Sequence, residues 1–158
     1  MESFSYYDLG RIEYGEALDL QTNSFQSLID AKRKGLEEKN CLYFCEHNPV
    51  LTLGKSGKET NLLVPELLLK EKGVSLFHID RGGDITYHGP GQITGYPVFD
   101  LDGFGMGLKA YIHTLEDIVI EFLLLYGVKA ERLDGATGVW LDSKVPGAAR
   151  KICAIGVK

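Results

Sequence analysis

The sequence lacks an excess of positive charge. Lysine and arginine together number 17, against 22 aspartate and glutamate residues, which gives a net charge of -5 at pH 7. A general nucleic-acid or anionic-membrane surface needs the opposite balance, so we expect neither nucleic acid nor membrane as a partner. Small molecules and other proteins are left as the expected partners.

Long apolar runs are also missing, so no segment is predicted to span a bilayer. The N-terminal residues 1–4 lack the basic and apolar regions of a secretory signal peptide. Cysteine is scarce, and its three copies are an odd number that argues against a disulfide framework. Together these absences predict a cytoplasmic protein in a reducing compartment.

What the sequence does contain is the composition of an ordinary globular domain. Of its 158 residues, 44% are hydrophobic and 25% are charged. We find no internal repeat and no low-complexity linker in it. A chain of this length buries about two-thirds of its unfolded surface. We therefore expect one domain over residues 1–158.

Hydrophobic periodicity predicts an α/β (α+β) fold. Apolar residues recur at helical spacing over residues 108–126, and Gly127 follows as a terminator. Short connections between strands indicate antiparallel pairs, so we expect a mixed, mostly antiparallel sheet flanked by helices. Strands are expected at residues 3–9, 41–45, 50–53, 74–79, 93–101 (interrupted at Gly95), 138–141 and 151–157, and helices at residues 14–39, 65–72 and 108–126.

The most informative stretch is residues 81–92, which combine four glycines and a proline with bulky polar side chains. Glycine packs nothing in a core strand, and a plain surface turn does not need Tyr87 and His88 between its glycines. Glycine also lets the backbone approach a ligand, while Arg81, Thr86 and His88 supply convergent polar groups. A long irregular loop that closes a hairpin is the alternative. We favour a binding loop.

The four histidines differ in what their surroundings indicate. His88 is the one favoured for a site, as a hydrogen-bonding wall or as a positioner of the loop. His47 lies beside Pro49 and has no role that we can derive. His78 on an expected strand and His113 on an expected helix are predicted to be structural.

Asp80 and Asp84 flank the first glycines of the same stretch. Two such carboxylates could serve general acid–base chemistry or a hard metal ion. With a glycine-rich turn between them, orienting Arg81 or capping the turn is favoured. No Cys/His pair with zinc spacing is present, so we expect no metal site.

Three segments, residues 46–54, 81–92 and 151–157, resemble the lipoyl(octanoyl) transferase family, the octanoyltransferases of lipoate biosynthesis. The resemblance implies a fold like the biotin/lipoate protein ligase catalytic domain. It also implies transfer, without a cofactor, of an octanoyl group from octanoyl-acyl carrier protein to a lysine of a lipoyl domain. The acceptor would be a lipoyl domain of a 2-oxoacid dehydrogenase complex or the glycine cleavage H protein.

The resemblance assigns roles to individual residues. In the family a cysteine thiolate takes the acyl group, and a lysine lowers the pKa of that cysteine. The family lysine matches Lys151, which is the expected catalytic residue. Backbone N–H groups of the binding segments could hold the thioester carbonyl as an oxyanion. Substrate binding is assigned to Arg81, Gly82, Gly83, Asp84, Ile85, Thr86, Tyr87, His88, Ala154, Ile155 and Gly156.

The family's nucleophilic cysteine follows the lysine in an Asn-Pro-Cys-Gly-like context, and the chain up to Lys158 contains no such segment. We therefore expect a chain that lacks its C-terminal segment and its nucleophile. Cys153 lies two residues from Lys151 and is the substitute to consider. Free cysteine usually packs as a small hydrophobe, so Cys41, Cys45 and Cys153 are all expected to be structural.

Two alternative functions stay open at this point. One is a non-catalytic module of the same fold that binds the acyl group or its carrier. The other is an ATP-dependent lipoate or biotin protein ligase. The absence of a nucleotide-binding pattern such as a P-loop argues against the ligase.

Overall fold

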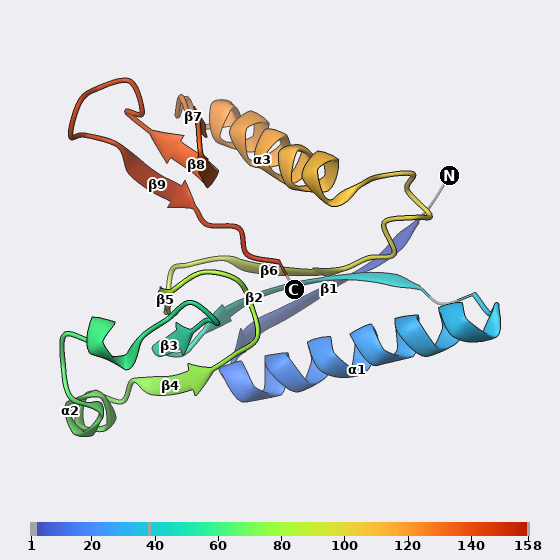
Figure 1. The fold of residues 1–158 in the computed structure, drawn as a ribbon, viewed down its shortest axis with the longest axis horizontal. Coiled ribbons are helices and arrows are strands. Elements are labelled where there is room, and N and C mark those ends of the chain that lie inside the picture. The colour runs from blue at the N-terminus through green and yellow to red at the C-terminus, as the bar shows by residue number, and fades with distance from the viewer. Residues whose placement is uncertain (1–2, 38, 158) are drawn as a thin grey trace. The chain divides into compact units, whose positions relative to one another are not determined.

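The computed structural model describes residues 3–37 and 39–157, and its chain divides into two compact units (Figure 1). The first unit runs to Asp100 and the second extends from Leu101 to Val157. The single domain expected from the sequence stays a prediction. Among the described residues, no helix combines the length and apolar character that a membrane crossing requires.

One sheet of the first unit is built from β1 (Phe4–Ile12), β2 (Asn40–His47) and β6 (Thr94–Val98), in the order β1-β2-β6. The pairing of β1 with β2 is parallel, and that of β2 with β6 is antiparallel. Helix α1 (Tyr14–Lys34) runs along this sheet (Figure 1) and buries Tyr14, Ala17 and Ala31. It ends five residues earlier than predicted because Gly35 adopts a left-handed conformation that caps it.

Strand β6 is continuous through Gly95, so the predicted interruption there is wrong. The glycine makes room for a ring of the neighbouring strand. A Cβ atom at this position would lie 2.7 Å from Cε1 of Phe44. Gly95 is therefore explained by packing between β2 and β6 and not by a break in the strand.

The second sheet of this unit has the order β4-β3-β5, from β3 (Val50–Leu53), β4 (Ser75–His78) and β5 (Ile85–His88). Strand β3 pairs in parallel with β4 and antiparallel with β5. A 3₁₀ turn, η1 (Glu59–Asn61), and a short helix, α2 (Glu66–Glu71), connect β3 to β4. Residues 85–88 were expected to be loop, and they form a strand because isoleucine, threonine and tyrosine favour the β conformation. The glycines mark only its two ends.

The second unit contains helix α3 (Leu108–Leu125) and an antiparallel sheet of order β7-β8-β9, from β7 (Glu131–Leu133), β8 (Ala136–Leu141) and β9 (Arg150–Cys153). The predicted helix ends within one residue of the observed one. Strand β7 was missed, although the Asp134-Gly135 pair that turns it into β8 is typical of a hairpin. Strand β9 ends at Cys153, so the predicted strand to residue 157 was too long.

The predicted fold class is confirmed. Of the six strand pairings among the described residues, four are antiparallel and two are parallel, so the pairing is mixed and mostly antiparallel, and helices accompany the sheets. The strands are divided among three separate three-stranded sheets where one sheet was expected.

Candidate functional site

The glycine-rich turn before β5 is held by backbone hydrogen bonds to the segment that follows β3. The N–H groups of residues 54–56 donate to the carbonyl oxygens of Asp84, Arg81 and Gly83, at 2.9, 3.0 and 3.2 Å respectively. The two segments are so close that a Cβ atom at Gly54 would lie 2.5 Å from the Gly83 oxygen. The turn is thus fixed by main-chain contacts, and the carbonyls of these three residues face residues 54–56.

Arg81 directs its guanidinium into the protein. Its Nη2 donates to the carbonyl oxygen and to Oγ1 of the fully buried Thr52, at 3.1 and 2.8 Å, and its Nη1 donates to the Gly82 oxygen at 2.9 Å. The carboxylate of Asp84 accepts from Asn61 at 2.6 Å and so ties the turn to η1. Arg81 is therefore oriented by Thr52 and Gly82, and these contacts brace the turn.

Strand β5 lies at the edge of its three-stranded sheet. The Gly54 N–H donates to the Asp84 oxygen, so this pair is hydrogen-bonded across the two segments. Because hydrogen-bonded and non-bonded pairs alternate along antiparallel strands, this bond fixes which residues of β5 turn their backbone N–H and C=O groups toward β3. By that alternation the backbone N–H and C=O groups of Ile85 and Tyr87 point to the open edge. The Tyr87 oxygen accepts from Gln92 Nε2 at 3.3 Å there. The edge thus presents backbone N–H groups of the kind that bind a carbonyl oxygen.

His88 lies at the end of β5 with its ring stacked on Tyr14, the ring planes 14° apart and the centroids 6.2 Å apart. Its Nδ1 lies 2.6 Å from the amide oxygen of Gln92, which only accepts, so Nδ1 carries the proton and Nε2 is the acceptor nitrogen. Burial lowers the pKa of His88 below its ordinary value. The residue is therefore a neutral hydrogen-bonding group at neutral pH.

His47, for which no role could be derived from the sequence, is a fully buried polar side chain near this position. It is 0% exposed. Its Nδ1–H donates to the carbonyl oxygen of Ile12 at 3.0 Å, and its Nε2 accepts from the hydroxyl of Tyr96 at 2.7 Å. Burial raises the pKa of Tyr96, which keeps that hydroxyl protonated. His47 thereby joins β1, β2 and β6, and its ring lies edge-on to His88 at 5.9 Å.

Lys151 lies in the second unit, on β9, opposite Trp140 of β8. Its side chain is exposed, and its Nζ lies 4.6 Å from the centroid of the Trp140 ring. An ammonium over an indole face is held by a cation–π attraction. The indole is anchored in turn, because its Nε1 donates to the Ala136 oxygen at 3.0 Å. The Lys151 ammonium therefore has a defined position at the surface, over the Trp140 ring.

Ala154, Ile155 and Gly156 follow β9 and belong to neither a helix nor a strand. Ile155 is half-buried, whereas Ala154 and Gly156 are exposed. The predicted site residues therefore fall into two groups. Residues 81–88 are in the first unit, and Lys151 with residues 154–156 is in the second.

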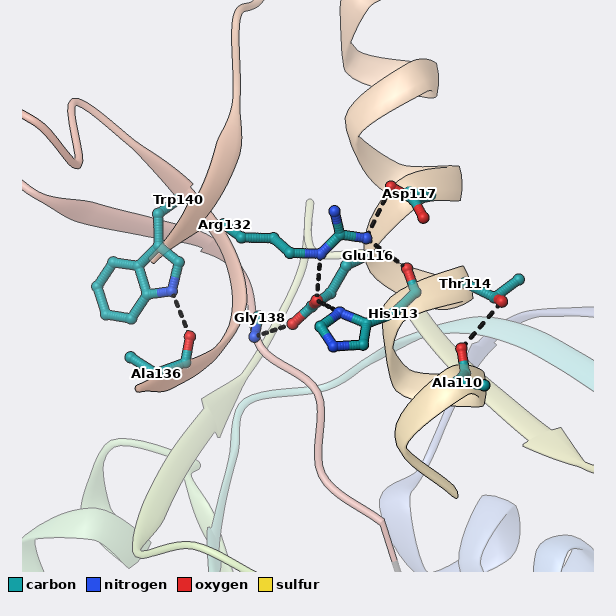
Figure 2. Close-up of polar contacts among 9 residues, drawn as sticks. All are labelled: Ala110, His113, Thr114, Glu116, Asp117, Arg132, Ala136, Gly138 and Trp140. Atoms are coloured by element: carbon teal, nitrogen blue, oxygen red, sulfur yellow. Dashed lines mark hydrogen bonds and ion pairs between the residues drawn. The ribbon is translucent and has the colours of Figure 1, made fainter. Parts of the chain in front are cut away.

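A buried carboxylate that sequence reasoning missed lies in the second unit (Figure 2). Glu116 of α3 is 3% exposed, accepts from the backbone N–H of Gly138 at 2.9 Å and pairs with Arg132 Nε at 2.7 Å. Burial opposes its ionisation, but the Gly138 and Arg132 contacts lower its pKa overall. Arg132 also contacts Asp117 and the His113 oxygen, each at 2.7 Å. The sequence pattern that could have indicated this residue is a glutamate at a position of α3 where the helical repeat otherwise places apolar residues.

Cys45 and Cys153 are poorly suited to act as nucleophiles. Burial raises the pKa of the Cys45 thiol to about 11. Burial also raises the pKa of Cys153, with a further contribution from the Glu116 charge that Lys151 only partly opposes. Since the thiolate is the reactive form, both are protonated at neutral pH. Cys41 is half-buried on β2.

Over residues 3–37 and 39–157, the structure gathers no group of three or more His, Cys, Asp or Glu side chains that could hold a metal ion.

Comparison with known proteins finds closely similar sequences. Residues 13–158 match the family described as the lipoyl protein ligase A/B catalytic domain. The chain is 68% identical over 158 residues to an octanoyltransferase of Parabacteroides distasonis, and this match covers the whole chain and 72% of the relative. Octanoyltransferases of Porphyromonas gingivalis and Bacteroides fragilis are 56% and 55% identical over 155 and 147 residues. These matches cover 98% and 93% of the chain but only 32% and 66% of those relatives.

Solved structures of lipoate ligases share the fold. A bipartite lipoate protein ligase of Thermoplasma acidophilum superposes with a TM-score of 0.63 over 96% of this chain and 54% of that one, at 17% identity. A lipoate-protein ligase A bound with ATP gives a TM-score of 0.55 over 85% of this chain and 51% of that one, also at 17% identity. At such identities the likeness concerns the fold alone.

Proposed function

Because the chain belongs to the lipoyl protein ligase A/B catalytic-domain family, we propose that it serves octanoyl transfer, moving the acyl group from octanoyl-acyl carrier protein to a lysine of a lipoyl domain. The observation that carries the proposal is the 68% identity, over every residue of the chain, to a relative named octanoyltransferase. The Thermoplasma acidophilum ligase belongs to a lipoylation system that includes its E2 lipoyl domain, which supports a lipoyl domain as the acceptor.

Lys151 is the proposed catalytic residue. Its ammonium is exposed and is held in place over Trp140, so it is available to a thiol or thioester brought to the surface of β9. A nearby ammonium stabilises a thiolate and thereby raises the fraction of nucleophile present at neutral pH. The same charge favours the anion that develops on a thioester oxygen.

Residues 81–88 are the proposed acyl-binding segment. The turn is fixed by its main-chain bonds, so it requires little ordering when substrate binds. The open edge of β5 offers N–H groups of Ile85 and Tyr87 to a carbonyl oxygen, and neutral His88 closes the end of the strand. Pre-organised donors of this kind are the usual basis of oxyanion stabilisation.

Neither Cys45 nor Cys153 is the nucleophile in this proposal, since burial raises the pKa values of both thiols. The P. distasonis relative is longer than the part that matches this chain. A chimera in which residues 1–158 replace that matching part therefore supplies the rest of a transferase around this chain.

The test compares this chimera with the P. distasonis octanoyltransferase. Each protein is incubated with octanoyl-acyl carrier protein and a lipoyl domain, without ATP, and the lipoyl domain is weighed by intact mass spectrometry. We expect one octanoyl group on the lipoyl domain in both reactions. A chimera that is folded and binds the carrier but leaves the lipoyl domain unmodified would contradict the proposal and favour a non-catalytic binding module.

A further inference from the structure

We propose that Glu116 is a positioning residue for Lys151, acting through the kink of β8 at Gly138 and the indole of Trp140. The inference rests on the catalytic role proposed above for Lys151. Glu116 does not contact Lys151 itself in this scheme. It fixes the backbone on which the lysine lies.

The first step is the kink. Gly138 is buried with φ +115°, and a Cβ atom there would lie 2.4 Å from the Cys153 oxygen, so only glycine fits. In a straight strand, residues 136 and 140 would lie about 13 Å apart. Nevertheless Trp140 Nε1 donates to the Ala136 oxygen at 3.0 Å. A bend at Gly138, which lies between them, explains how the indole reaches that oxygen.

The second step is the path of the lysine. Gly138 and Trp140 are two residues apart on β8, and the pairing of β8 with β9 shifts register between Val139 and Trp140. Cδ of Lys151 lies 3.4 Å from the position that a Cβ atom of Gly138 would take, and its Nζ lies 4.6 Å above the Trp140 ring. The aliphatic part of the Lys151 side chain therefore passes over Gly138, which has no side chain, to reach the indole. The position of the ammonium thus depends on the bend of β8 at Gly138.

The third step is what holds the kink. One carboxylate oxygen of Glu116 accepts the Gly138 N–H, and the other is bound by Arg132 Nε at 2.7 Å and His113 Nδ1 at 3.2 Å (Figure 2). Because Glu116 is 3% exposed, water cannot readily replace it as the acceptor. Asp117 shares Arg132 at 2.7 Å, is exposed and makes no contact with Gly138 in the cluster that Figure 2 draws.

These contacts supply a matched set of three variants. Glu116→Ala removes the acceptor of the Gly138 N–H, whereas Glu116→Gln keeps an oxygen for it. Asp117→Asn changes the neighbouring partner of the same arginine and leaves Gly138 untouched. A positioning role predicts a large effect for Glu116→Ala, a smaller one for Glu116→Gln and none for Asp117→Asn. A role limited to pairing with Arg132 predicts similar effects for all three.

The first readout requires no activity. Competitive acetylation of the 158-residue chain, quantified by peptide mass spectrometry, gives the rate at which Lys151 reacts relative to the exposed Lys129. Release of the ammonium from the indole is expected to raise this ratio about two- to fivefold in Glu116→Ala and in Trp140→Leu. Asp117→Asn should leave it unchanged. An unchanged ratio in Trp140→Leu overturns the proposal even if Glu116→Ala fails to fold.

The second readout is kinetic and uses the chimera. Glu116→Ala and Trp140→Leu should each lower kcat of octanoyl transfer about ten- to a hundredfold, with the KM for octanoyl-acyl carrier protein unchanged. The double variant should be no slower than the slower single one, because both act through one lysine. Additive effects would overturn the proposal. If the unsubstituted chimera transfers nothing, the proposed function fails while the acetylation ratios still decide the positioning of Lys151.

Discussion

The turn before β5 and the lysine of β9 are held in different ways. Backbone bonds from residues 54–56 fix the glycine-rich turn, and the side chain of Arg81 adds to them. Lys151 is held over the Trp140 ring, and the Glu116 carboxylate binds the backbone of β8 at Gly138. A turn fixed by its main chain is sensitive to added atoms, whereas a lysine held by side chains is sensitive to their removal.

The largest effect is expected at the lysine itself. Lys151→Ala in the chimera should lower octanoyl transfer by about 10²- to 10⁴-fold, the range typical of losing a group that assists proton transfer or ionisation. The exposed side chain contributes little to packing, so the thermal unfolding of the variant should be nearly unchanged. Transfer at near-normal rates by Lys151→Ala would remove this residue from the mechanism.

The turn is expected to respond to one added methyl group. Gly54→Ala places a Cβ atom 2.5 Å from the Gly83 oxygen, so the variant should lose about 1–3 kcal/mol of unfolding free energy. Gly15→Ala is the matched control, since Gly15 lies in the first turn of α1 and its Cβ atom would lie 3.6 Å from Cζ of Phe77 on β4, an ordinary contact distance. There the same substitution should stabilise by up to about 1 kcal/mol. Urea unfolding of both variants checks the opposite signs, and equal effects would contradict the assigned turn geometry.

A smaller effect should appear as a pH dependence of stability. Burial lowers the pKa of His88, so the unfolded chain binds its proton more readily than the folded one. Stability is therefore complete above the unfolded pKa of about 6.5 and declines as pH falls below it toward the folded pKa. His88→Gln should flatten the slope of unfolding free energy between pH 5 and pH 7, the range just around that unfolded value. A slope that persists in the variant would assign the titration to another group.

The smallest effect is expected at Cys153. Its raised pKa makes it a poor nucleophile, so Cys153→Ala should leave octanoyl transfer by the chimera within about twofold of the unsubstituted protein. Loss of transfer together with loss of a hydroxylamine-sensitive octanoyl adduct would instead identify Cys153 as the acyl-accepting thiol.

Local patterns in the sequence were enough to predict several elements. The apolar spacing over residues 108–126 predicted α3, because a helix that buries one face must repeat its apolar residues. The three family-like segments led to the octanoyltransferase resemblance, which the relatives confirm. Residues 85–88 were misread because the glycines around them outweighed their own preference for a strand.

Long-range pairs could not be predicted in the same way. Glu116 and Arg132 are 16 residues apart, and neither shows which charge it will meet until α3 packs against the sheet that contains β7 and β8. The bond between Arg81 and Thr52 likewise depends on β3 and β5 becoming neighbours. His47 was read without a role because its partners Ile12 and Tyr96 lie on two other strands.

The most direct test of the account is a competition between two acyl donors. The chimera is given a lipoyl domain, unlabelled octanoyl-acyl carrier protein, and deuterated octanoate with ATP and magnesium. Intact mass spectrometry then reports which octanoyl group reaches the lipoyl domain. The account predicts the unlabelled group, transferred equally well when ATP is omitted. A deuterated group that appears only with ATP would contradict the account and make the chain part of a ligase.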